Sequence, residues 1–263
     1  MNKYAVEFEN VSLVRNSVRI LDNVSLKIKD RESVAIIGPN GSGKTSLMKL
    51  MKGGAWPYYD ENVRTICRLF GEDRWNIFDL RKKIGVVSMD LQSRFKDQTS
   101  VGAVVLSGFF RTVDIYRDHE ITDEMVAAAE DAAARVGISD KLTRDISKLS
   151  LGEMRRALIA RALVPGPKML LLDEPMTSLD IVAEGQFKNV LDSLIKEGTG
   201  IVMITHDLED IPKNVQRIIM IKNGRIFKDG NKKELLTSNI MSDLFSSAVE
   251  VNEENGMYRM RAV

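Results

Sequence analysis

Residues 33–45, Ser-Val-Ala-Ile-Ile-Gly-Pro-Asn-Gly-Ser-Gly-Lys-Thr, join a short apolar run to a glycine-rich turn. The turn, Gly38-Pro39-Asn40-Gly41-Ser42-Gly43-Lys44-Thr45, fits the pattern G-x-x-x-x-G-K-[ST]. Glycines let backbone N–H groups converge on phosphate oxygens, the lysine reaches the β- and γ-phosphates, and the threonine hydroxyl binds Mg²⁺. A strand pattern precedes the turn and a helical pattern follows it to about residue 52. We therefore predict a phosphate-binding loop, with an ordinary glycine-rich turn as the alternative.

A pair of carboxylates follows a second apolar run. Residues 169–172, Met-Leu-Leu-Leu, read as a buried strand that ends at Asp173 and Glu174. A carboxylate at such a strand end, beside the phosphate loop, can hold Mg²⁺ through water, and its neighbour can orient or deprotonate an attacking water. An aspartate at the end of a strand is common by itself. Together with the upstream loop, the pair predicts hydrolysis of a nucleoside triphosphate.

A second anion site is predicted at residues 148–156, Lys-Leu-Ser-Leu-Gly-Glu-Met-Arg-Arg. Ser150 and Glu153 have the spacing of a capping box, and a helical pattern follows them. A helix start offers free N–H groups and the positive end of the helix dipole. The chain thus carries two candidate anion sites that lie far apart in its sequence.

Strands that alternate with helices predict an α/β fold, with a mostly parallel sheet and helices on both faces. Residues 4–31 alternate like an antiparallel β region, and Asn223-Gly224 predicts a type I′ hairpin. The block from about 95 to 164 reads as a helical insertion, and residues from about 231 to 263 as a C-terminal extension, all within one domain over 1–263. The other expected elements are strands at 63–66, 84–88, 201–205, 217–222 and 225–228, helices at 122–136 and 181–197, and otherwise irregular chain over 53–83.

Composition excludes several classes of protein. The chain has 38 Lys and Arg against 37 Asp and Glu, a net charge of +1, whereas a protein built to bind nucleic-acid backbones is strongly basic. One cysteine and two histidines make a protein-held zinc or iron–sulfur site improbable and fit a reducing compartment. Neither a signal-peptide pattern nor an uncharged apolar run long enough to span a membrane is present. We expect no nucleic-acid partner.

Five ordered motifs resemble one family. GPNGSGKT, LSLGE, LLLDEP, SLD at 178–180 and THD at 205–207 together resemble the nucleotide-binding subunit of ABC transporters, from about residue 4 to about 235. The resemblance implies a P-loop NTPase fold and ATP with Mg²⁺. It also implies a homodimer or heterodimer in which two domains pair head to tail. Each ATP would lie between the loop of one domain and the LSLGE helix start of the other, which explains two distant anion sites.

The resemblance assigns roles to individual residues. Glu174, His206 and Gln92 are the implied catalytic residues. Four positions depart from the family pattern. Leu151 stands in place of the first glycine, and Glu153 in place of a glutamine, where it can serve as a cap residue that points away from the phosphate. Met89 stands where another glutamine is usual, so that role passes to Gln92, and Arg15 replaces an adenine-stacking aromatic residue. The guanidinium of Arg15 can stack on a purine, or it is a solvated surface group. The implied ATP contacts are Arg15, the loop from Gly38 to Thr45 with Ser46, and Ser150, Gly152 and Asp180 across the dimer; the implied Mg²⁺ ligands are Thr45, Asp173 and Gln92.

These assignments lead to a functional prediction. We expect an Mg-dependent ATPase that energises transport through a separate membrane permease and lies in the cytoplasm against the membrane. Residues 223–245 resemble the ending of importers of metal ions, metal chelates and oxyanions. A soluble ABC ATPase without transport is the alternative, supported by the unusual glutamine region, where family members contact their permease. A generic P-loop kinase or GTPase would leave LSLGE, SLD and THD unexplained.

Overall fold

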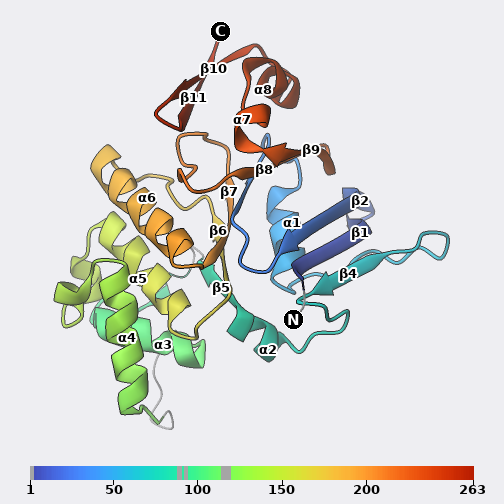
Figure 1. Cartoon of the computed structure of the whole chain (residues 1–263). Helices are drawn as coiled ribbons and strands as arrows, with labels where there is room; N and C mark the ends of the chain where they lie inside the picture. The colour runs from blue at the N-terminus through green and yellow to red at the C-terminus, as the bar shows by residue number, and fades with distance from the viewer. Residues whose placement is uncertain (1–2, 88–90, 92–93, 114–119) are drawn as a thin grey trace.

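The computed structural model describes residues 3–87, 91, 94–113 and 120–263. Its centre is a six-stranded sheet in the order β5-β6-β7-β3-β8-β9, in which every neighbouring pair is parallel except the edge pair β8–β9 (Figure 1). The mostly parallel sheet predicted from the sequence is therefore confirmed. Its strands are β3 (Val34–Ile37), β5 (Ile84–Val87), β6 (Met169–Asp173), β7 (Gly200–Thr205), β8 (Arg217–Lys222) and β9 (Arg225–Asn231).

Both faces of this sheet are buried, which explains the nearly continuous apolar runs of its central strands. In β3, Ala35 and Ile37 belong to one buried cluster, whereas Val34 and Ile36 belong to another. Successive side chains along a strand point to opposite faces, so each central strand contributes to both clusters.

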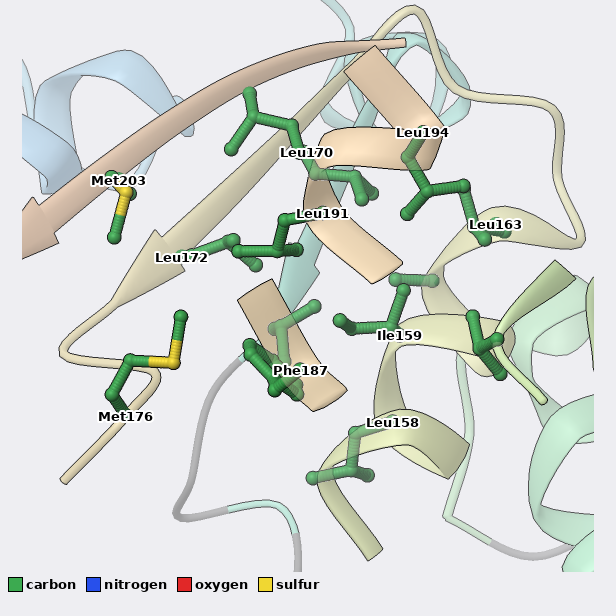
Figure 2. Close-up of a cluster of buried hydrophobic side chains, with 14 of the residues drawn as sticks. Leu158, Ile159, Leu163, Leu170, Leu172, Met176, Phe187, Leu191, Leu194 and Met203 are labelled. Carbon is green, nitrogen blue, oxygen red and sulfur yellow. The ribbon is translucent and has the colours of Figure 1, made fainter. Parts of the chain in front are cut away.

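The first cluster lies between the sheet and a layer of helices (Figure 1). Figure 2 shows Phe187, Leu191 and Leu194 of α6 among side chains of α5 and of strands β6 and β7. The block from 95 to 164 shares this cluster, because residues of its three α-helices are buried in it. The layer comprises α3 (Val101–Phe110), α4 (Asp123–Arg135), α5 (Leu151–Leu163) and α6 (Ile181–Lys196), with two short 3-10 helices at Ser139–Lys141 and Ile146–Lys148.

The second cluster lies between the other face and an antiparallel sheet in the order β2-β1-β4. Phe8 and Leu21 of the antiparallel sheet and Leu47 of α1 are fully buried there. The predicted antiparallel N-terminal region is confirmed, and within residues 4–31 it consists of two long strands that pair with each other. The elements are β1 (Tyr4–Arg15), β2 (Val18–Lys29), β4 (Ile66–Leu69), α1 (Lys44–Met51) and α2 (Ile77–Lys83).

Two expectations for residues 53–83 were wrong. The strand expected at 63–66 begins only at Ile66, because Val63 belongs to a turn in which its N–H donates to Asp60 O over 3.1 Å. The segment expected to be irregular also contains α2. Asn76 caps this helix by accepting a hydrogen bond from Phe78 N over 2.8 Å, an N-cap signal that the sequence does contain.

The C-terminal region follows the sequence prediction. Asn223 and Gly224 both have positive φ, 50° and 75°, as a type I′ turn requires, and they join β8 to β9. Beyond β9 lie α7 (Lys232–Leu235), α8 (Ser238–Phe245) and the hairpin of β10 (Val249–Glu254) and β11 (Met257–Ala262). None of the helices that the structure describes combines the length and apolar character needed to cross a membrane.

Candidate nucleotide-binding site

The glycine-rich loop leaves the carboxyl end of β3 and enters α1, as the sequence predicts. Gly41 and Gly43 have φ of 77° and 107°, values that favour glycine. A Cβ at Gly43 would lie 2.8 Å from Leu21 Cδ2, and one at Gly38 would collide with Ile221 O. The loop is therefore shaped by close packing against β2 and β8, as well as by its own turn.

Lys44 folds over this loop. Its side chain is buried, and Nζ donates to Gly38 O over 2.7 Å and to Pro39 O over 3.0 Å. Burial lowers the pKa of Lys44, while the carboxylates of Glu174 and Asp173 act in the opposite direction. A phosphate oxyanion is a stronger acceptor for an ammonium than a neutral carbonyl is. The Lys44 ammonium can therefore exchange its two carbonyl partners for phosphate oxygens.

One polar atom in the loop has no protein partner. Ser42 is buried, and its Oγ makes no hydrogen bond to the described residues. Buried hydroxyl groups normally have a partner, so this atom calls for a group from outside the chain. Thr45 is exposed at the start of α1 and Ser46 is half-buried beside it, so neither residue is closed off from a ligand at the loop.

The two predicted carboxylates lie at the carboxyl edge of the central sheet. Asp173 ends β6 opposite Ile204 of β7, and Glu174 N donates to Ile204 O over 2.9 Å. Since β7 also pairs with β3, with Ile37 opposite Thr205, the loop and the carboxylates meet at the same edge. This juxtaposition is what the sequence predicts from parallel strands.

His206 joins the same edge. Its Nδ1 lies 3.2 Å from Glu174 Oε1, so the two side chains predicted to be catalytic contact each other. Hydrogen bonds of Thr205 fix the segment that follows His206. The Thr205 hydroxyl donates to Asp210 Oδ2 over 2.5 Å and accepts from Asp207 N over 3.0 Å. Burial raises the pKa of Asp210 to about 6.

The second anion site is a capped helix start. Glu153 N donates to Ser150 Oγ over 3.2 Å, and Ser150 N donates to Glu153 Oε2 over 2.8 Å, which confirms the predicted capping box. The backbone N–H of Ser150 holds the pKa of Glu153 below its ordinary value. Within the described residues, the N–H groups of Leu151 and Gly152 have no partner. Two backbone donors are thus left at the first turn of α5, beside the exposed Ser150.

Asp180 lies next to this helix start. It caps α6 by accepting from Ala183 N over 2.8 Å, and a Cβ on Gly152 would lie 2.9 Å from Ala183 Cβ. Gly152 therefore lets the first turns of α5 and α6 approach closely. No hydrogen bond or ion pair within the described part of the chain joins this corner to the loop at 38–45. The two predicted anion sites remain separate in a single chain.

Within the described residues, no hydrogen bond or ion pair joins Arg15 to this arrangement. Arg15 is exposed at the end of β1, where it pairs with Val18 across the turn into β2. Gln92 lies outside the described residues, as does Met89. Within the described residues, no group of three or more acidic, histidine or cysteine side chains is placed to hold a metal ion. Mg²⁺ in nucleotide sites needs only one or two protein ligands besides phosphates and water, so Thr45 and Asp173 suit it.

The sequence pattern by itself gave no role to Arg155. This residue of α5 is 4% exposed, and its guanidinium donates to Pro175 O and Thr177 O, in the segment that follows Glu174. A signal does exist in the sequence. Arg155 has helical spacing to Leu158, Ile159 and Ala162, so it falls on the apolar stripe of the helix, where a charge is unexpected.

Comparison with known proteins decides the family. A family model described as "ABC transporter" matches residues 21–177, which include the loop, the helix start and both carboxylates. The chain belongs to the ABC transporter ATP-binding family. Members of this family bind ATP and are ATPases, so this ABC protein is an ATPase.

The relatives cover nearly the whole ABC chain. An uncharacterized ABC transporter ATP-binding protein of Bacillus subtilis, YlmA, is 32% identical over 250 residues, 94% of this chain and 92% of that protein. The energy-coupling factor transporter ATP-binding protein EcfA1 of Mycoplasmoides gallisepticum is 31% identical over 88% of this chain and 79% of its own length. Among solved structures, CbiO1 of Clostridium perfringens, part of the ABC transporter complex CbiONQ, has a TM-score of 0.77 at 27% identity, over 92% of this chain and 94% of that one.

Proposed function

We propose that this ABC protein hydrolyses MgATP as a head-to-tail dimer and energises transport through a separate membrane permease. The observation that carries the proposal is the separation of the two anion sites. One chain presents a phosphate loop with its carboxylates at one place, and at another a helix start with two N–H groups that have no partner in the described part of the chain. A second domain in the opposite orientation brings one of each to both nucleotides.

Exposed apolar side chains beside the helix start support pairing. Ile181 is 88% exposed and Val182 is 68% exposed, at the start of α6 next to Gly152. Large apolar residues that are almost fully exposed, beside unpaired backbone donors, are typical of a surface that another protein covers. We expect a second ABC domain, of this chain or of a related one, to cover them.

The chain's own residues divide the chemistry between them. Lys44 and the loop N–H groups neutralise the phosphates, and Thr45 and Asp173 are the oxygen ligands available to Mg²⁺. The metal, when bound, spreads the charge that builds up on the transferred phosphoryl group. Glu174 orients and deprotonates the attacking water, and His206, 3.2 Å from it, fixes the carboxylate and approaches the γ-phosphate. Ser150 and the N–H groups of Leu151 and Gly152 serve the partner's nucleotide.

Transport is supported by the relatives. EcfA1 is named as an ATP-binding protein of an energy-coupling factor transporter, and CbiO1 as part of a transporter complex. These names favour coupling to a transporter, and the importer-like ending at 223–245 favours import of a metal ion, a metal chelate or an oxyanion. A soluble ABC ATPase without transport is the other outcome of the tests below.

Trapping tests the ATPase mechanism and pairing together. Glu174→Gln should keep ATP affinity, lose at least about 100-fold in turnover because water activation is removed, and form an ATP-dependent dimer on size-exclusion chromatography. Hydrolysis at the wild-type rate would rule out Glu174 as the general base. A trapped protein that stays monomeric at saturating ATP would contradict the dimer.

Mixing two inactive variants tests whether the site crosses chains. Ser150→Arg should bind ATP at near-normal affinity but neither pair nor hydrolyse, whereas Lys44→Ala should bind ATP more weakly through its own loop. A mixed dimer has one composite site in which both Lys44 and Ser150 are intact. Partial recovery of ATP-driven pairing in the mixture is expected. Full activity of Ser150→Arg alone would show that the helix start is only a capped helix end.

Copurification tests transport. The tagged Glu174→Gln chain should retain a membrane protein from detergent-solubilised membranes of its own cells, and the retained protein should have several predicted membrane spans. If no membrane protein remains bound while the ATP-trapped dimer forms normally, the soluble ATPase is the better reading.

A further inference from the structure

Arg155 is a buried cation whose hydrogen bonds all go to one short segment. The guanidinium donates to Pro175 O and to Thr177 O, whereas its Nε has no partner within the described residues. Burial lowers the pKa of Arg155, and the described charge that acts against this effect is the carboxylate of Asp210. The cation is thus held mainly by two neutral carbonyls.

Packing alone does not account for an arginine at this position. A buried charge without a hydrogen-bonded carboxylate is unfavourable, and an apolar side chain of similar length would fill the same space without that penalty. Leu158 and Ile159 lie on the same stripe of α5 and are buried, which shows that apolar side chains pack well on this face of the helix. An arginine differs in its planar fork of donors, which fixes the direction of two acceptors at once. Arg155 therefore fixes the positions of the Pro175 and Thr177 carbonyl groups relative to α5.

The segment that Arg155 holds lies between two residues of the nucleotide site. Glu174 precedes it and Asp180 follows it, and Glu174 itself has a φ of 46°. A non-glycine residue in the left-handed region is strained and keeps its conformation only where the surroundings hold it. Two carbonyl hydrogen bonds within three residues of Glu174 provide such support. Arg155 is also within about 8 Å along the helix axis of the capped start at Ser150, because each residue of an α-helix rises 1.5 Å.

We propose that Arg155 is a positioning residue that makes the start of α5 and the Glu174–Asp180 segment one mechanical unit. The helix start faces the partner's ATP and Glu174 faces the chain's own ATP, so the residue links the two composite sites through one chain. This inference rests on the proposed dimer. It adds that the two sites respond to each other through α5, and that a change at Arg155 alters catalysis and pairing while the ATP-binding loop stays intact.

The test compares neighbouring arginines. Arg155→Met removes the donors and keeps an unbranched side chain, whereas Arg156→Met is the matched control, because Arg156 donates to Gly137 O away from the site. Per active site, Arg155→Met should lose about 10-fold or more in kcat, as small displacements of catalytic groups do, with KM for ATP within about twofold. The Hill coefficient for ATP should fall towards one. Arg156→Met should match the wild type in all three.

A conservative variant guards against misfolding. Arg155→Lys keeps the charge but cannot direct two acceptors, so its kcat should lie between those of the wild type and Arg155→Met at an unchanged KM. If Arg155→Met is insoluble, this variant carries the test. A purely structural role predicts another pattern: a lower melting temperature and fewer folded molecules, with normal kcat and Hill coefficient per active site.

Pairing separates this inference from the proposed function. Glu174→Gln alone reports on the dimer, and Arg155→Met combined with Glu174→Gln reports on the link. We expect the combined variant to need at least about tenfold more ATP for pairing, at an ATP affinity within about twofold of its parent. If the parent does not pair, the proposed dimer fails. If the parent pairs and the combined variant pairs equally well, with Arg155→Met turning over normally, the positioning role of Arg155 is overturned.

Discussion

The glycine-rich loop and the start of α5 are the two predicted anion sites, and the structure surrounds them differently. The loop is packed from behind by β2 and β8, and its lysine is buried on its own carbonyls. At the helix start Ser150 is exposed, Leu151 is half-buried and Gly152 is buried, and the capping box joins Ser150 to Glu153. Within the described residues, the N–H groups of Leu151 and Gly152 have no hydrogen-bond partner. The loop is therefore shaped by its own chain, whereas no hydrogen bond or ion pair within the described residues joins the helix start to the loop. N–H groups at a helix start that have no acceptor within the described chain can bind an anion that another molecule supplies.

The largest effect on ATP affinity should come from a change at Lys44. This variant tests whether the loop of a single chain determines how tightly ATP binds. Lys44→Ala should weaken ATP binding by about 10- to 100-fold, since a hydrogen bond to a charged group contributes roughly 1.5–3 kcal/mol. The melting temperature without nucleotide should change little, because burial already disfavours the charged form of this lysine. Isothermal titration calorimetry measures the affinity. Lys49→Ala, an exposed lysine of the same helix, is the control, and equal affinities in the two variants would contradict the loop assignment.

Gly152 tests the helix start without touching its cap. Gly152→Ala places a Cβ 2.9 Å from Ala183 Cβ, so α5 must shift against α6. Overpacking of this kind costs roughly 1–3 kcal/mol, and we expect about tenfold weaker ATP-driven pairing in the Glu174→Gln background with ATP affinity unchanged. Adding Ala183→Gly removes the colliding atom and should restore pairing, with Ala183→Gly alone as the control. Pairing that is insensitive to Gly152→Ala would show that this corner faces no partner.

Arg15 tests how far the loop site extends along the nucleotide. Arg15→Ala should weaken ATP and GTP alike by about fivefold, because stacking of a guanidinium contributes roughly 1 kcal/mol and tolerates any purine. Arg15→Tyr should preserve both affinities, measured with fluorescent nucleotide analogues. If Arg15→Ala leaves both affinities intact, Arg15 is a solvated surface residue and the first site ends at the phosphates.

The smallest effect is a change in stability with pH, and it comes from Asp210, which accepts a hydrogen bond from Thr205 next to His206. Its neighbours Asp207 and Glu184 raise its pKa and Thr205 and Lys188 lower it, but burial dominates and brings it to about 6 in the folded protein. The folded state therefore holds this proton more tightly than the unfolded chain does, and the stability contributed by protonated Asp210 is lost as pH rises from about 4 to about 6. Asp210→Asn cannot titrate. Its melting temperature relative to wild type should rise between pH 5 and pH 7.5 by about 2–4 °C, on the order of 1 kcal/mol after allowance for partial exposure. A constant difference would mean that Asp210 is ionised throughout.

The sequence predicts the parts of the molecule that depend on local pattern. The loop, the capping box, the type I′ hairpin and the buried strands each have a short signature, and parallel strands place Asp173, Glu174 and His206 at the loop by topology alone. What the pattern misses depends on pairing between distant segments. The start of β4 is set by its register with β1, in which Ile66 lies opposite Glu9, and the local alternation around Val63 does not contain that information. The partners of Arg155 were missed for the same reason. They are backbone carbonyl groups, which every residue has, so the sequence does not show which of them accept its hydrogen bonds.

The turn at Asn223-Gly224 has a consequence for when the phosphate-binding loop can fold during synthesis. Gly224 N donates to Ser42 O over 3.0 Å, and Asp22 N donates to Gly224 O over 2.9 Å, so this late turn bridges the loop and β2. The strand that feeds the loop, β3, has as its two neighbours β7, which begins at Gly200, and β8, which begins at Arg217. On the ribosome, the glycine-rich segment therefore emerges long before the residues that shape it. A nascent chain that stalls before the turn is synthesised carries the full phosphate-binding sequence without the fold that binds, and such contacts between distant segments form slowly.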